Sequence, residues 1–233
     1  MREAGSEVPS SILRKKVGAS NINMNEIVGT HDILFVCLDT LRYDVAKQEE
    51  DNNGTPVINR YGKWKKCHAP GNFTYPSHMA MFAGFLPTPA DGQSMFDSEM
   101  LFFPKGIGMG KKGPENAFSF EGATFIEGLE KVGYDTYCIG GVSFFSKRAD
   151  IGKVLPSYFK YSYWNPSFGC AVKESFEHQI DFIRRKLEGV SPEQRIMMYV
   201  NVDSIHYPNY FYMAGKKEDD KETHAAALHY VDS

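Results

Sequence analysis

One apolar run indicates the architecture of this chain: Asp32-Ile33-Leu34-Phe35-Val36-Cys37-Leu38-Asp39, which ends abruptly in a carboxylate. A continuous apolar run is typical of a strand that is buried on both faces of a parallel sheet. Open α/β sheets bind ligands at the carboxyl ends of their strands. Asp39 is therefore a candidate functional residue, and its alternative role is to cap the turn that begins at Thr40.

A second run has the same pattern, Ile196-Met197-Met198-Tyr199-Val200-Asn201-Val202-Asp203, and His206 follows it closely. Two strands that both end in aspartate at the same edge of a sheet would converge on one site. We therefore expect Asp39 and Asp203 to lie near each other. His206 is either part of that site or a surface loop residue.

The segments around these runs favour alternating helices and strands. Apolar stripes that end at glycine predict helices over residues 125–132 and 172–187, and a strand is expected over 134–140. Residues 55–62 are expected to form a short helix, 64–68 a strand and 142–171 an irregular segment. In the last helix, His224 and His229 lack the i, i+4 spacing of a helical metal pair, so we expect them to be structural.

A hydroxyl precedes another expected helix, in the stretch Gly71-Asn72-Phe73-Thr74-Tyr75-Pro76-Ser77-His78. Pro76 suits the first turn of a helix, because its φ is fixed and it has no N–H to lose. The free N–H groups and dipole of a helix start favour an anion such as phosphate or sulfate. Thr74 is either a nucleophile, which needs a metal or base to remove its proton, or only a helix cap.

Composition limits the function classes. The 233 residues carry 26 basic and 29 acidic side chains and a net charge of -3, which does not suggest a nucleic-acid partner. The four cysteines form no CxxC pair and favour a reducing cytoplasm. No apolar run approaches the roughly 20 residues that span a bilayer, so no membrane association is expected. Residues 1–23 are polar and aperiodic, and we expect them to be disordered.

The order and spacing of several motifs resemble the alkaline phosphatase and sulfatase superfamily. They are Leu38-Asp39-Thr40-Leu41-Arg42-Tyr43-Asp44, Thr55-Pro56, Thr74-Tyr75-Pro76-Ser77-His78 and Gly84-Phe85-Leu86-Pro87. Sulfatases carry Cys-x-Pro-x-Arg, in which a cysteine or serine becomes formylglycine. Here Thr74 holds that position and His78 replaces the arginine. The sequence is thus more similar to the metal-activated phosphodiesterase and phosphatase branches, where Thr-x-Pro-x-His occurs.

The resemblance implies an α/β fold for residues 24–233, a three-layer sandwich with a mostly parallel sheet and helices on both faces. It implies a divalent metal, zinc or manganese, and a small anionic ester as substrate. The implied metal ligands are Asp39, Thr74, Asp203 and His206. Thr74 would also be the nucleophile, and His78 and His206 would contact the substrate.

One motif of the family is missing. The family has an Asp-His-Gly motif after the equivalent of the last helix, whereas no Asp-His pair occurs in these 233 residues. We therefore expect the domain to lack its C-terminal part. Two functions stay open: a metal-dependent hydrolase of phosphate, sulfate or phosphonate esters, or a catalytically incomplete member that binds an anion or a protein. A mutase with the same chemistry would need an additional cap domain.

Overall fold

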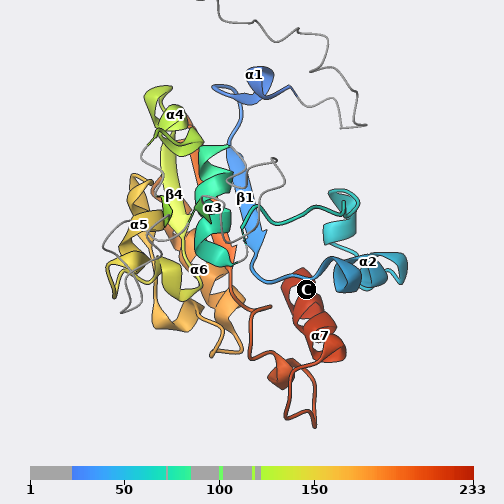
Figure 1. Ribbon diagram of the computed structural model, residues 1–233. Coiled ribbons are helices and arrows are strands. Elements are labelled where there is room, and N and C mark those ends of the chain that lie inside the picture. The colour runs from blue at the N-terminus through green and yellow to red at the C-terminus, as the bar shows by residue number, and fades with distance from the viewer. Residues whose placement is uncertain (1–22, 72, 85–99, 102–116, 119–121) are drawn as a thin grey trace, which may run out of the picture.

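A four-stranded parallel sheet forms the centre of the fold in this computed structural model, which describes residues 23–71, 73–84, 100–101, 117–118 and 122–233 (Figure 1). Its strands lie in the order β1 (Ile33–Leu38), β6 (Ile196–Val202), β4 (Asp135–Ile139) and β5 (Tyr161–Tyr163). Every neighbouring pair is parallel, as the two long apolar runs predict. The short strands β2 (Met100–Leu101) and β3 (Ala117–Phe118) form a separate parallel pair.

Seven α-helices occur in the described part of the chain. They are α1 (Met24–Ile27), α2 (Tyr43–Asp51), α3 (Thr74–Ala83), α4 (Phe125–Lys131), α5 (Ile151–Ser157), α6 (Ser175–Leu187) and α7 (Lys221–Asp232). Single 3-10 turns lie at η1 (Ile58–Arg60), η2 (Ser143–Phe145), η3 (Pro166–Phe168) and η4 (Tyr210–Tyr212). None of these described helices has the length and apolar character needed to cross a bilayer.

Both faces of the sheet are covered, because alternate side chains of a buried strand point to opposite faces. On one face, Cys138, Met197 and Tyr199 pack against α3, α4 and α5 (Figure 1). On the other face, Ile139 and Val200 pack against apolar side chains of α6. The expected parallel α/β sandwich with helices on both faces is confirmed.

The helices α2 and α7 lie together at the β1 side of the sheet (Figure 1). Their contact is a small apolar cluster that includes Ala46, Ala227 and Leu228, together with Ile205 from the loop after β6. This cluster connects the chain that leaves β1 to the chain that leaves β6. It therefore helps to fix both strand ends, where the candidate residues lie.

Several local expectations were wrong. Helix α3 begins at Thr74, two residues before Pro76, so Thr74 is its first residue and Phe73 occupies the cap position. No strand forms over residues 64–68. The segment 142–171, expected to be irregular, contains α5 and β5, and β5 has only three residues, too few to show a period. The segment 1–22 of the expected disordered extension lies outside the described residues.

We expect Gly141→Ala to destabilise the fold at the carboxyl end of β4. An added Cβ would lie 2.4 Å from the backbone oxygen of Asn201 and 2.7 Å from Cβ of Asp203, which is too close for real atoms. Overpacking of this kind typically costs about 1–3 kcal/mol. Urea unfolding measures the effect.

The matched control is Gly128→Ala, in α4, where an added Cβ meets nothing within 4 Å. Alanine has the higher helix propensity, so this variant should be at least as stable as the wild type. Equal stability of Gly141→Ala and the wild type would show that the two strand ends are not packed this closely.

Candidate functional site

Asp39 and Asp203 follow the two neighbouring strands β1 and β6. Leu38 pairs with Val202 in the register, and the amide of Asp39 donates a hydrogen bond to the Val202 carbonyl oxygen over 3.0 Å. Both aspartates are buried, with 7% and 3% of their surface exposed. The structure thus brings the two carboxylates to one edge of the sheet, as the strand pattern predicts.

Thr74 lies beside Asp39. Its hydroxyl donates a hydrogen bond to Asp39 Oδ1 over 3.4 Å, and the other carboxylate oxygen accepts one from Asn201 Nδ2 over 2.9 Å. Thr74 is the first residue of the ten-residue helix α3, whose first N–H groups have no partner within the helix. The hydroxyl therefore lies between a fixed carboxylate and the positive end of a helix dipole.

Asn201 holds this arrangement together from inside β6. Its side-chain oxygen accepts hydrogen bonds from the amides of Gly141 and Val142, over 3.3 and 2.9 Å, while its Nδ2 donates to Asp39. Gln179 of α6 donates to the Asn201 backbone oxygen over 2.9 Å. Sequence reasoning missed Asn201, although a single side-chain amide inside an apolar strand run was the available signal.

Asp203 has one fixed and one unpaired oxygen. Its Oδ2 accepts a hydrogen bond from the Cys170 amide over 2.8 Å, whereas its buried Oδ1 has no partner among the described residues. Burial raises the pKa of Asp203 to about 6, because the charged form loses its hydration. The negative charge of Asp39 contributes to this raised pKa, and the Cys170 amide and His206 oppose it.

Within the described residues, one group of candidate metal-binding side chains comes together: Cys170, Asp203 and His206, whose ligand atoms lie within 4.8 Å of one another. Asp39 is not a member of this group. Of the four expected ligands, Asp39 thus contacts Thr74, whereas Asp203 groups with His206. Cys170 was missed because it lies in the loop between η3 and α6, where the sequence has no regular pattern.

His78, an expected substrate contact, is buried and contacts the first turn of α3. The side chain is 2% exposed, and its ring packs edge-on against the rings of Phe82, Phe145 and Tyr199. Its Nδ1 donates to the Thr74 backbone oxygen over 2.6 Å, and its Nε2 accepts from the Tyr199 hydroxyl. Burial lowers the pKa of His78. The ring therefore supports the first turn of α3 from within the core.

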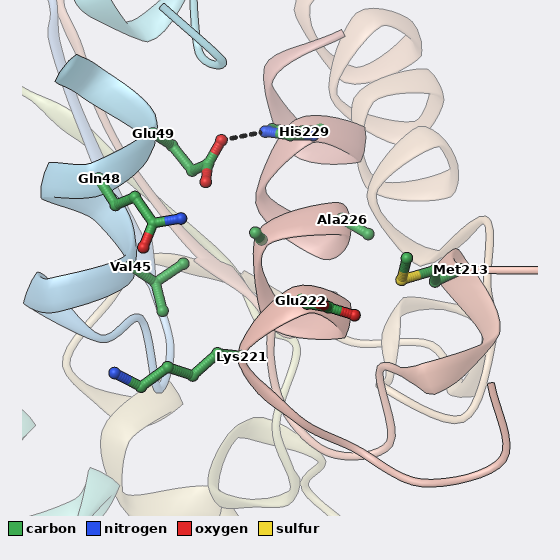
Figure 2. Close-up of a pocket in the computed structure, with 9 residues that line it drawn as sticks. Val45, Gln48, Glu49, Met213, Lys221, Glu222, Ala226 and His229 are labelled. Atoms are coloured by element: carbon green, nitrogen blue, oxygen red, sulfur yellow. Dashed lines mark hydrogen bonds and ion pairs between the residues drawn. The ribbon is translucent and has the colours of Figure 1, made fainter. Parts of the chain in front are cut away.

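The two histidines of α7 have structural partners. His224 Nε2 accepts a hydrogen bond from the Arg42 amide over 3.3 Å, and His229 pairs with Glu49 over 2.6 Å. Figure 2 shows this second pair beside a cavity of about 290 Å³ between α2 and α7. The lining comes from these two helices and Met213, so the cavity is separate from the strand-end site.

We expect the stability of the metal-free protein to depend on pH through Asp203. Its carboxyl stays protonated to about pH 6 in the folded protein, whereas the unfolded chain releases the proton near pH 4. The folded state binds more protons in this window, so the free energy of unfolding should fall as the pH rises through it. Asp203→Asn removes this loss and should be the more stable protein above pH 6, by on the order of 2 kcal/mol.

Urea unfolding from pH 4 to 8 measures this difference, and Asp181→Asn, which changes an exposed aspartate of α6, is the control. The stability curve of the control should run parallel to that of the wild type. The assignment is contradicted if the Asp203→Asn curve also runs parallel to the wild type.

Comparison with known proteins gives matches in structure. No family model and no curated protein sequence matches the chain. The lipoteichoic acid synthase LtaP from Listeria monocytogenes matches with a TM-score of 0.52 and 12% identity, over 87% of this chain and 49% of that one. A protein in the alkaline phosphatase superfamily from Vibrio parahaemolyticus matches with a TM-score of 0.51 and 20% identity, over 87% and 48%.

This chain spans about half the length of these two solved structures. The matched part includes most of the chain, and its centre is the parallel sheet at whose carboxyl edge Asp39 and Asp203 lie. The chain therefore has the α/β fold of the alkaline phosphatase superfamily.

Proposed function

We propose that this protein is a metal-dependent hydrolase of small anionic esters, of phosphate or of related sulfate or phosphonate, and that Thr74 is its nucleophile. One observation carries the proposal. The Thr74 hydroxyl lies at the start of a ten-residue helix and donates a hydrogen bond to Asp39, a buried carboxylate at a strand end of the shared fold. A hydroxyl, a proton acceptor and an anion-binding helix start are thus side by side.

The reaction needs two displacements at phosphorus. In the first, the Thr74 proton passes to Asp39 Oδ1 and the threonine oxygen bonds to phosphorus. The bond between phosphorus and the leaving oxygen breaks, and the leaving oxygen keeps the electron pair and takes the proton from Asp39. In the second displacement, water attacks phosphorus and gives a proton to Asp39. The bond between phosphorus and the threonine oxygen breaks, and this oxygen takes the proton from Asp39. The products are free phosphate and the original Thr74 hydroxyl. The 3.4 Å hydrogen bond is long, as catalytic contacts often are before substrate binds.

The neighbours of Thr74 keep these two groups in place. Asn201 fixes the Asp39 carboxylate through Oδ2, which leaves Oδ1 for the threonine proton. His78 donates to the Thr74 backbone oxygen and so fixes the first turn of α3. The N–H groups of this turn favour the negative charge that spreads over the phosphoryl oxygens in the transition state.

The residues present fit a divalent metal. A buried oxygen without a hydrogen bond is costly, and a cation would satisfy Asp203 Oδ1. Asp39 and Thr74 would hold a metal ion with oxygen ligands, and Asp203 with His206 would supply a second set. When bound, zinc or manganese would act as a Lewis acid that lowers the pKa of the hydroxyl and offsets the charge of the ester.

A second candidate function is the binding of an anion or a protein without catalysis. It is favoured by the number of ligands near Thr74: among the described residues these are two, Asp39 and Thr74 itself, whereas a catalytic zinc ion usually has three from the protein. Both functions would use the helix start of α3. Only the hydrolase would depend on the Thr74 hydroxyl for turnover of the ester.

We expect Thr74→Val to abolish metal-dependent ester hydrolysis and Thr74→Ser to retain part of it. Valine keeps the shape of threonine but has no hydroxyl, whereas serine keeps the hydroxyl. Loss of a nucleophile lowers turnover by on the order of 1000-fold or more. The assay uses p-nitrophenyl phosphate, bis(p-nitrophenyl) phosphate and p-nitrophenyl sulfate with added zinc or manganese.

Circular dichroism of each variant checks that the fold is retained. Equal turnover by Thr74→Val and the wild type would contradict the role of Thr74. If no ester is turned over by the folded wild type with either metal, the binding function is the better account of this site.

A further inference from the structure

Three side chains with different metal-binding atoms meet at the carboxyl end of β6. Cys170 comes from the loop between η3 and α6, Asp203 follows the strand directly, and His206 lies on the loop beyond it. Their sulfur, oxygen and nitrogen atoms lie within 4.8 Å of one another. Cys170 is a free thiol, and it was not among the ligands that the sequence suggested.

A second observation indicates that this group has a ligand. Only 3% of the Asp203 surface is exposed, and its Oδ1 has no hydrogen-bond partner among the described residues. The Cys170 amide holds Oδ2 over 2.8 Å, so Oδ1 is the oxygen left for another partner. Because an unpaired buried carboxylate oxygen is unfavourable, the site favours a bound cation.

The imidazole of His206 is also arranged as in a metal ligand. A backbone carbonyl can only accept, so the 3.0 Å contact of Nδ1 with the Tyr207 oxygen requires the ring proton on Nδ1. In the neutral ring, the lone pair is then on Nε2. Histidines that bind metals usually hold their other ring N–H in this way, on a carboxylate or a carbonyl oxygen.

We propose that Cys170, Asp203 and His206 bind a zinc ion through a thiolate, a carboxylate oxygen and an imidazole nitrogen. The thiolate and the imidazole favour zinc over magnesium, calcium and manganese, which prefer oxygen ligands alone. Three protein ligands leave one position of a tetrahedral ion open. Asp203 and His206 are the second set of ligands in the proposed function, and Cys170 is the ligand that this inference adds. Occupation of the site does not depend on ester hydrolysis.

The geometry requires only a small adjustment. Zinc binds sulfur, nitrogen and oxygen at about 2.0–2.3 Å, so its tetrahedral ligand atoms lie roughly 3.5 Å apart. Atoms up to 4.8 Å apart would have to approach by about 1 Å. Cys170 and His206 both lie outside helices and strands, where such a shift does not disturb a hydrogen-bonded ladder.

The test is a titration of the metal-free protein with cobalt(II), which replaces zinc and absorbs in the near ultraviolet when a thiolate binds it. The wild type should develop this charge-transfer absorption, and zinc should remove it. Cys170→Ser should lose the absorption and bind zinc at least about 10-fold more weakly. The matched control Cys67→Ser changes an exposed thiol and should behave as the wild type does.

A second measurement uses only the wild type and does not depend on how a variant folds. Zinc should protect Cys170 from alkylation by iodoacetamide but leave Cys67 reactive, as peptide mass spectrometry would show. The proposal is overturned if the wild type shows no thiolate absorption, if Cys170→Ser retains it, or if zinc leaves Cys170 unprotected.

The variant Thr74→Val separates this site from the proposed function. It should keep the cobalt absorption and the zinc affinity of the wild type, because Thr74 belongs to the other set of ligands. Loss of the absorption in Thr74→Val would show that the two sets form one site and would overturn the separate zinc site. If zinc binds at Cys170 and no ester is hydrolysed, this inference stands and the proposed function does not.

Discussion

The parallel pairing of β1 and β6 is the constraint on which the candidate site depends. It aligns Leu38 with Val202, so the aspartates that follow the two strands are forced to the same buried edge. Burial and the neighbouring charge of Asp39 both raise the pKa of Asp203. Buried carboxylates need polar partners, and the hydrogen bonds from Thr74, Asn201 and the Cys170 amide provide them.

The two aspartates are stabilised in different ways. Asp39 is held on both oxygens, by Asn201 and by the Thr74 hydroxyl. Asp203 is held on one oxygen by the Cys170 amide, and its other oxygen has no hydrogen-bond partner within the described part of the chain. Under the proposed function, Asp39 is the proton acceptor beside the Thr74 hydroxyl, and Asp203 is a buried carboxylate suited to a cation.

The sequence predicts the parts of this structure that long, regular patterns encode. The two apolar runs gave the strands and the expected approach of Asp39 to Asp203, and the fold resembles that of known superfamily structures. The short elements were not predictable, because the three residues of β5 show no period and α2 buries only a narrow stripe around Val45 and Ala46. Cys170 was missed because it lies in a loop, between η3 and α6, that has no regular pattern.

Side-chain direction was the other limit. His78 is in the expected motif, but whether its ring faces a ligand or the core depends on the packing of Phe82 and Tyr199, which no local sequence pattern predicts.

The most direct test of the central claim is mass spectrometry of protein quenched in acid during reaction with p-nitrophenyl phosphate and zinc. A nucleophilic threonine predicts one added phosphoryl group, located on Thr74. Hydrolysis of the ester without any phosphorylation of Thr74, or phosphorylation of another residue, would contradict the account.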